Sequence, residues 1–141
     1  MGLMGLDVGE KRIGVAIANA EGLVAIPLTV LHRVGEEADL KAILALAEEH
    51  GVKRIVVGLP RSMDGSIGKQ AQVVLAFCKL LSQHIDIPVD TWDERLSTVA
   101  AERLLSDAGM KREKRKARRD AMAAALVLQG YIDRARSSSA Q

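Results

Sequence analysis

The sequence predicts an α/β protein with one mixed five-stranded β-sheet and helices on both faces of the sheet. Three observations lead to this prediction. The first 33 residues hold three extended apolar segments separated by short turns. The spacing of the apolar residues then changes, so that helical segments alternate with short apolar strands. Apolar residues make up 48% of the 141 residues, which is enough for the core of a single domain, expected over residues 1–136.

The N-terminal segments predict an antiparallel meander. Residues 3–8 and 12–19 are joined only by the turn at residues 9–12, and a connection this short requires antiparallel neighbours. A third extended segment, residues 23–33, follows a hairpin loop and contains Pro27, which is typical of an edge strand. In this topology the first strand is expected at the centre of the sheet, beside the fourth.

The remainder of the chain predicts helices and strands that return to the same sheet through right-handed crossovers. The expected elements are, in order, a helix around residues 40–50 ended by Gly51, a strand at 54–59, a helix around 71–81, a strand at 87–92, a helix capped by Ser97 or Thr98 and closed by Gly109, and a last helix that begins near Asp120. The complete order is βββαβαβαα. The tail at residues 137–141 is expected to be disordered.

Asp7 lies inside the first strand, where an ionised carboxylate is costly to bury and Asp is a poor strand former. A residue that breaks two local rules indicates a functional position. The alternative is that Asp7 only turns the chain by accepting backbone N–H groups. Gly5 in the same strand and Gly14 in the next indicate a close backbone approach or a bulge.

Two further acids, Glu94 and Asp120, are expected to meet Asp7. Ligands in open α/β sheets gather at the carboxyl ends of strands near a switch in strand order. Glu94 follows the fifth strand, and Asp120 opens the last helix. Each acid also has an ordinary interpretation, since Glu94 could be an exposed loop acid and Asp120 an acid favoured by the helix dipole. Asp90 and Asp93 are rivals of Glu94, and the sequence alone does not choose among them.

A cluster of carboxylates repels itself unless protons or cations are shared. Oxygen ligands without His or Cys favour Mg²⁺ or Mn²⁺. Two such ions close together can activate water and stabilise the leaving oxygen in phosphodiester cleavage. The joint occurrence of three acids therefore predicts a two-metal site held by Asp7, Asp120 and either Glu94 or one of its rivals Asp90 and Asp93.

Basic residues surround the predicted site and favour a nucleic acid as the partner. The segment at residues 111–119 is interpreted as a flexible arm that holds phosphates, and its alternative is a solvated charge cluster. The loop at residues 60–69 could hold a phosphate at a helix amino end or be a simple strand-to-helix turn. The candidate phosphate-binding side chains are Lys11, Arg12, Arg61, Lys69, Arg95, Lys114, Arg115 and Lys116.

Four motifs in this order resemble the YqgF/RuvX family and cover nearly the whole chain. They are Gly5-Leu6-Asp7-Val8-Gly9 with Lys11-Arg12-Ile13-Gly14-Val15-Ala16, Val57-Gly58-Leu59-Pro60 with Met63-Asp64-Gly65, Asp93-Glu94-Arg95-Leu96-Ser97-Thr98, and the segment from Asp120 through Ala123-Ala124 to Leu128-Gln129. Together, in this order, the four motifs are highly specific.

The resemblance is to Holliday-junction-resolvase-like proteins that are regarded as pre-16S rRNA nucleases. It implies an RNase H-like fold and metal-dependent cleavage at the 5′ end of pre-16S rRNA during ribosome biogenesis. The acidic site implied is Asp7, Glu94 and Asp120, so the resemblance selects Glu94 over Asp93. The sequence departs from the family at Asn19, where members often have Asp, and in the high basic content before Asp120.

Three alternative functions stay open. ATP-binding proteins of the actin and hexokinase type share the Asp-x-Gly turn, but they hold nucleotide between two such domains, which one 141-residue domain cannot form. A non-catalytic nucleic-acid-binding module would bind without cleaving in Mn²⁺. A Holliday junction resolvase acting on four-way DNA requires a symmetric dimer, and the sequence does not determine the oligomeric state.

Composition excludes several other classes. Aromatic residues are only 2% of the chain, which argues against a protein that stacks bases on aromatic platforms. The single cysteine, Cys78, excludes an internal disulfide. No apolar run could span a bilayer, and a strand already occupies the N-terminal residues, so neither a membrane anchor nor a signal peptide is expected. The expected location is the cytoplasm.

Overall fold

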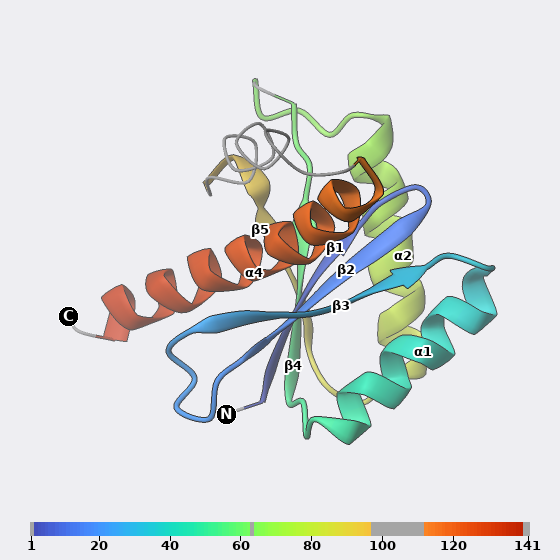
Figure 1. The fold of residues 1–141 in the computed structure, drawn as a ribbon. Coiled ribbons are helices and arrows are strands. Elements are labelled where there is room, and N and C mark those ends of the chain that lie inside the picture. Colours follow the sequence, from blue (N-terminus) through green and yellow to red (C-terminus); the bar gives the residue numbers. More distant parts are fainter. Residues whose placement is uncertain (1, 63, 97–111, 140–141) are drawn as a thin grey trace.

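The computed structural model describes residues 2–62, 64–96 and 112–139, which form a five-stranded sheet with helices on both sides (Figure 1). The strands are β1 (Leu3–Val8), β2 (Arg12–Ala18), β3 (Ala25–His32), β4 (Arg54–Leu59) and β5 (Val89–Asp93). Their order in the sheet is β3-β2-β1-β4-β5. Because β1 pairs antiparallel with β2 and parallel with β4, the predicted central position of the first strand is confirmed.

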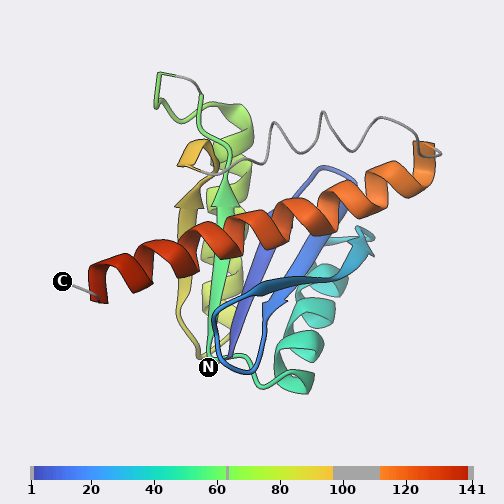
Figure 2. The same cartoon turned by 60° about the vertical axis from the view of Figure 1, so that its left-hand side comes forward.

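The helical elements are α1 (Glu36–Glu49), α2 (Lys69–His84), the 3₁₀ turn η1 (Glu94–Leu96) and α4 (Arg112–Ser139). α1 and α2 cover one face of the sheet, and α4 crosses the other face (Figure 2). Within the described ranges, no helix is long and apolar enough to cross a membrane. The helix predicted between Ser97 or Thr98 and Gly109 lies outside the described residues.

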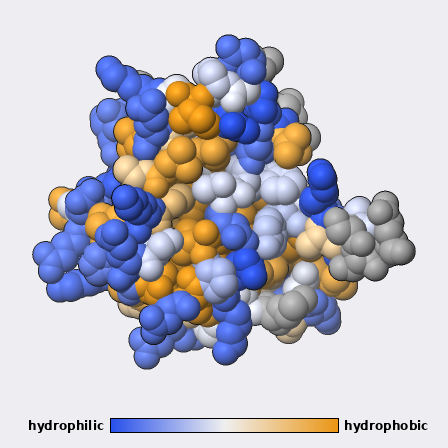
Figure 3. Space-filling view, turned by 180° about the vertical axis from the view of Figure 1, so that it is seen from behind, coloured by the Kyte–Doolittle hydropathy of each residue, from blue (hydrophilic) through white to orange (hydrophobic). Residues whose placement is uncertain are grey.

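The two faces of the sheet have different packing. On the α1–α2 face the core is built from large aliphatic side chains such as Leu6, Ile43 and Leu81. On the α4 face the packing residues are smaller, and the helix contributes a run of buried alanines. The surface seen from behind has apolar residues among hydrophilic ones (Figure 3), and on α2 the side chains of Val73 and Leu75 are partly exposed. The small residues have their effect on the other face. Small residues let α4 lie close to the strands.

β3 forms one edge of the sheet and contains Pro27, as predicted. Its pairing with β2 shifts between Val15 and Ala16, so that these neighbours oppose Thr29 and Pro27. The shift leaves Leu28 without an opposing residue, which is the arrangement of a β-bulge. Proline is tolerated at this place because an edge strand does not need every N–H group for the sheet.

The start of α4 corrects one prediction. The sequence placed a flexible basic arm before a helix beginning near Asp120, but α4 begins at Arg112. Lys, Arg, Glu and Ala are strong helix formers, so the basic segment extends the helix although cations at a helix N-terminus are unfavourable. Asp120 consequently lies well inside α4. At the other end α4 includes residues 137–139, where a disordered tail was expected, and residues 140–141 lie outside the described part.

Two glycines in the sheet bring α4 against the strands, in agreement with the close backbone approach predicted for them. A Cβ atom added to Gly5 would lie 2.8 Å from the carbonyl oxygen of Ala124. A Cβ atom added to Gly14 would collide with the carbonyl oxygen of Asp120. The absence of these side chains therefore fixes the distance between the sheet and the segment of α4 that carries Asp120.

We expect Gly14→Ala to destabilise the protein by about 3 kcal/mol or more, because a methyl group must displace the backbone of α4. The measurement is the free energy of unfolding in urea. Gly35→Ala is the matched control, since an added Cβ there meets nothing within 4 Å. An equal and small effect of both substitutions would contradict the close packing of α4 on β2.

Asp39, in the first turn of α1, is a buried acid remote from the three candidate ligands, with 4% of its surface exposed. Its carboxylate accepts hydrogen bonds from the Arg33 side chain and from the backbone N–H of Val34, both at 3.1 Å. Burial raises the pKa of Asp39, but the hydrogen bonds from Val34, Arg33 and Gly35 outweigh it and leave the pKa below its ordinary value. The charged form therefore stabilises the fold.

We expect Asp39→Asn to cost about 1–3 kcal/mol of stability at pH 7. A carboxyl whose pKa is lowered in the folded state stabilises above its unfolded pKa of about 3.9, and this contribution is lost as the pH falls through the folded pKa. The difference between wild type and variant should therefore shrink below about pH 4. Urea unfolding at several pH values tests this, with Glu49→Gln on the exposed end of α1 as the control. A loss that is independent of pH would contradict it.

Candidate active site

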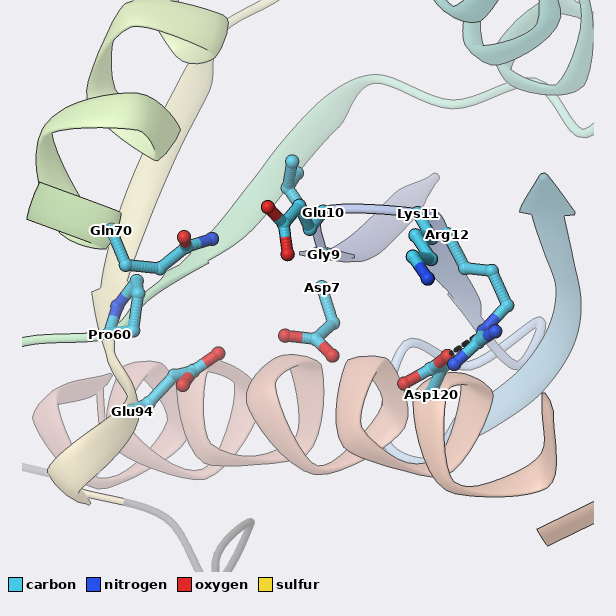
Figure 4. Close-up of a pocket in the computed structure, with 10 residues that line it drawn as sticks. Asp7, Gly9, Glu10, Lys11, Arg12, Pro60, Gln70, Glu94 and Asp120 are labelled. Carbon is cyan, nitrogen blue, oxygen red and sulfur yellow. Dashed lines mark hydrogen bonds and ion pairs between the residues drawn. The ribbon is translucent and has the colours of Figure 1, made fainter. Parts of the chain in front are cut away.

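A cavity of about 420 Å³ opens at the carboxyl ends of β1 and β4. Its lining residues are Asp7, Val8, Gly9, Glu10, Lys11, Arg12, Pro60, Gln70, Glu94 and Asp120. Figure 4 shows Gln70 and Glu94 reaching in from one side and Arg12 meeting Asp120 on the other, with Asp7 between them. The three acids predicted from the sequence therefore line one cavity, although they come from three separate elements.

Asp7 is the most enclosed of the three acids, with 7% of its surface exposed. It lies near the carboxyl end of β1 and is paired in register with Gly14 of β2. A side chain at position 14 would collide with the backbone of Asp120, so the glycine lets α4 bring Asp120 next to this position of the sheet. Asp7, whose place inside a strand was unusual for an acid, therefore lies at the floor of the cavity.

Glu94 is the first residue of η1 and follows directly on β5. A Cβ atom added to Gly58 of β4 would lie 2.8 Å from Glu94 Oε1. The glycine thus leaves the volume into which the Glu94 carboxylate extends. A larger residue at position 58 would occupy the space that the Glu94 side chain now fills.

The rivals of Glu94 have other partners. Asp93 accepts hydrogen bonds from Arg95 at 2.6–3.1 Å and lies 4.0 Å from Arg61, and the bond from Arg95 lowers the pKa of Asp93. Asp90 is bonded by Arg54 and by the hydroxyl group of Tyr131. Neither acid lines the cavity. Glu94, which lies beyond the end of β5 in η1, is thus the acid of this segment that lines the cavity.

Asp120 is held by Arg12, whose Nε donates to Asp120 Oδ2 at 2.7 Å. The two side chains are 23% and 17% exposed, so the pair is only partly screened by water. Arg12 begins β2 and Asp120 belongs to α4, and their bond joins the sheet to the helix at the mouth of the cavity. The Arg12 guanidinium thus offsets the charge of Asp120, one of the three acids predicted as metal ligands.

The predicted phosphate-binding residues do not all lie at the cavity. Lys11 and Arg12 line it. Arg61 and Arg95 lie together beside Asp93, outside the lining. Lys69 begins α2, next to the lining residue Gln70. The side chains of Lys114, Arg115 and Lys116 lie outside the described part.

The loop at residues 60–68 has internal hydrogen bonds. The N–H of Ser62 donates to the carbonyl of Ser66 at 3.1 Å, and Asp64 Oδ1 accepts from the N–H of Ser66 at 2.9 Å. Gly65 has φ +88°, a conformation that favours glycine, and an added Cβ would lie 3.4 Å from the Arg95 guanidinium. These bonds are those of a compact turn, and its capacity for phosphate stays a prediction.

Sequence reasoning missed two lining residues, Glu10 and Gln70. Both follow the carboxyl end of a strand, directly or after a loop, so the carboxyl-end rule could have included them. Asn19, in contrast, lies outside the cavity: its side-chain oxygen accepts from the N–H groups of Leu23 and Val24 in the β2–β3 hairpin. Asp could accept the same bonds, so the departure from the family at this position concerns the hairpin.

The donor set fits a hard divalent cation, because carboxylate oxygens are the ligands such cations prefer. The space beside Gly14 is filled by the backbone of Asp120, and the space beside Gly58 is filled by Glu94 and Val127, so the two glycines let two of the acids approach the cavity. In the part of the chain that the structure describes, no three His, Cys, Asp or Glu side chains are already grouped tightly enough to hold a metal. Cation binding would therefore require the carboxylates to close on the ion.

Comparison with known sequences identifies relatives along almost the entire chain. A family model described as RuvX, Holliday junction resolvase, matches residues 1–134. A protein of Desulforamulus reducens is 49% identical over 133 residues, which cover 94% of this chain and 97% of that protein. A protein of Clostridioides difficile is 47% identical over 131 residues, which cover 93% of each. Both carry the name "Putative pre-16S rRNA nuclease".

Solved structures show the same fold. Thermus thermophilus RuvC in complex with a Holliday junction substrate superposes with a TM-score of 0.62 at 16% identity, covering 99% of this chain and 97% of that chain. The yeast mitochondrial Holliday junction resolvase gives a TM-score of 0.53 at 13% identity, covering 92% and 77%. The fold is RNase H-like, as in these resolvases. With its family-model match and its curated relatives, the chain belongs to the RuvX family.

Proposed function

We propose that the chain is a nuclease that hydrolyses phosphodiester bonds at the 5′ end of pre-16S rRNA, with divalent cations held by Asp7, Glu94 and Asp120. One observation carries the proposal: three carboxylates from β1, η1 and α4 line a single cavity whose lining also includes Lys11 and Arg12. The names of the relatives, which are up to 49% identical, supply the substrate class. The proposal includes a cytoplasmic location and a single domain over residues 1–136.

Mg²⁺ or Mn²⁺ bound by the three acids would supply an activated water and stabilisation of the leaving oxygen. The chain's own residues have distinct tasks. Asp7 at the floor and Glu94 beside Gly58 offer their oxygens from two sides. Lys11 and Arg12 attract the phosphate backbone, which uncompensated carboxylates would repel. Arg12 also holds the Asp120 carboxylate at the mouth of the cavity.

A second candidate, cleavage of four-way DNA, is favoured by the description of the family as Holliday junction resolvases. Resolution of such a junction needs paired cuts and therefore two sites related by symmetry. The relatives that are 47–49% identical to this chain are named for cleavage of pre-16S rRNA, whereas the resolvase structures are only 13–16% identical to it. We therefore favour the RNA substrate.

The deciding experiment compares three substrates under identical conditions: an RNA carrying the 5′ extension of 16S rRNA, an unstructured RNA of equal length, and a four-way DNA junction. Each is incubated with the full chain in Mg²⁺, in Mn²⁺ and in chelator, and Asp7→Asn serves as the negative control. We expect metal-dependent cleavage of the precursor RNA. Selective cutting of the DNA junction would replace the proposal by resolution, and binding without cleavage would indicate a non-catalytic module.

A further inference from the structure

The turn between β1 and β2 forms one wall of the cavity. Gly9, Glu10, Lys11 and Arg12 all line it. The turn has a hydrogen bond of its own, from the N–H of Gly9 to the carbonyl of Arg12 at 2.8 Å. Glu10 and Lys11 are exposed, so little of this wall is held by burial. Arg12 also pairs with His32 of β3 and with Asp120, so the turn before it is the part of this wall whose position depends on further contacts.

Arg33, the residue after β3, binds the turn at two points. Its backbone N–H donates to the carbonyl oxygen of Lys11 at 2.9 Å. Its Nη1 donates to the carbonyl oxygen of Gly9 at 3.0 Å. One residue thus satisfies two backbone carbonyls of the wall, one from its main chain and one from its side chain.

The same guanidinium is also held by α1 and α2, the helices that cover one face of the sheet. Arg33 Nε donates to Asp39 Oδ2 in α1 at 3.1 Å, and Asp39 is 4% exposed. The guanidinium carbon lies 5.3 Å from the centre of the Phe77 ring in α2, and Phe77 is also 4% exposed. A cation over an aromatic face and a bonded buried carboxylate both hold the planar group in place. Arg33 therefore connects the β1–β2 turn to α1 through Asp39 and to α2 through Phe77.

We propose that Arg33 is a positioning residue of the active site: it fixes the β1–β2 turn, and through the turn it sets the place of Arg12 beside Asp120. Arg33 does not line the cavity, so it acts through the turn. Its effect on cleavage rests on the proposed function, but its effect on the turn does not. The competing explanation is that Arg33 only stabilises the start of α1 through Asp39.

The geometry requires arginine. A guanidinium presents several N–H donors in one rigid plane, so it can reach Gly9 and Asp39 together while stacking on Phe77. A lysine ammonium is a single point donor on a flexible stem and can satisfy one of these acceptors but not all contacts. Arg33→Lys should consequently retain the charge and restore only part of the function.

The first test measures amide hydrogen exchange of the full chain and is independent of catalysis. In Arg33→Ala we expect exchange of the amides at residues 9–12 to rise about tenfold or more, while amides of β1 and β4 remain protected. Arg33→Lys should be intermediate. Arg54→Ala is the matched control, because it removes another partly exposed ion pair, with Asp90, from the opposite end of the sheet. Unchanged exchange in the turn of Arg33→Ala would overturn the proposal.

The second test measures single-turnover cleavage of precursor RNA at temperatures well below the Tm of each variant. We expect the cleavage rate at saturating RNA to fall about tenfold to a hundredfold in Arg33→Ala, with a small change in RNA affinity, because misplacement affects the reacting geometry more than binding. Asp39→Asn keeps the Gly9 bond and should lose much less. A normal rate with a lowered Tm would assign Arg33 to α1 stability alone. If the wild type cleaves nothing, the proposed function fails, and the exchange test still decides the role of Arg33 in the turn.

Discussion

Asp7→Asn is expected to lower cleavage on the order of a thousandfold or more while leaving the fold as stable as the wild type, or more stable, in the absence of metal. The substitution keeps the size of the side chain and removes one charge from a floor position that is 7% exposed. Crowded carboxylates repel one another when no cation is bound. The other acids that line the cavity are Glu10, Glu94 and Asp120, of which Asp120 is paired with Arg12.

Metal should reverse this order of stability. A cation that binds only the folded state raises the free energy of unfolding by about 2.7 kcal/mol at a concentration of about one hundred times Kd. Thermal unfolding of wild type and Asp7→Asn, in chelator and in Mg²⁺ or Mn²⁺, measures the difference. Asp90→Asn is the control, since this acid is bonded to Arg54 and Tyr131 and does not line the cavity. A wild type that is the more stable protein in chelator, with no response of either protein to metal, would make Asp7 a structural acid.

The sequence predicts the sheet correctly because its strands are local patterns. Alternating apolar segments, short turns and Pro27 are sufficient to define the meander, and the edge position of β3 follows. The carboxyl-end rule also predicts that Asp7, Glu94 and Asp120 meet, and they line one cavity. Their roles as ligands stay a prediction.

What the sequence could not provide depends on contacts between distant residues. The bond of Arg12 to Asp120 joins positions 108 residues apart, and no local pattern shows it. Glu94 lines the cavity, whereas Asp93 is bonded to Arg95 outside it, and the sequence pattern does not show this difference. The predicted start of the last helix was wrong. Positive charges are unfavourable at a helix N-terminus, but Lys and Arg have a high helix propensity, and the propensity prevailed.

Replacing Lys114, Arg115 and Lys116 by Ala is expected to weaken binding of every nucleic acid about equally and to flatten its salt dependence. These residues belong to the first turns of α4, which continues into Asp120 at the cavity. Each phosphate that the variant no longer neutralises should reduce the slope of log K against log salt concentration by about 0.7 to 0.9, since fewer counterions are released. Alanine is a strong helix former, so the backbone of α4 should be retained.

The helical course of this segment makes the prediction stricter than a flexible arm would. The backbone of a helix has a fixed course, whereas a flexible arm could adapt to any nearby phosphate. The control is a triple variant that removes the same charge elsewhere, Lys79→Ala with Arg134→Ala and Arg136→Ala, at exposed positions of α2 and at the far end of α4. Binding is measured as a function of salt and paired with single-turnover cleavage, which should change far less because Asp7, Glu94 and Asp120 remain. Equal salt slopes for wild type and the 114–116 variant would show that the segment is only a solvated charge cluster. Equally weakened binding in the two triple variants would assign the effect to net charge alone.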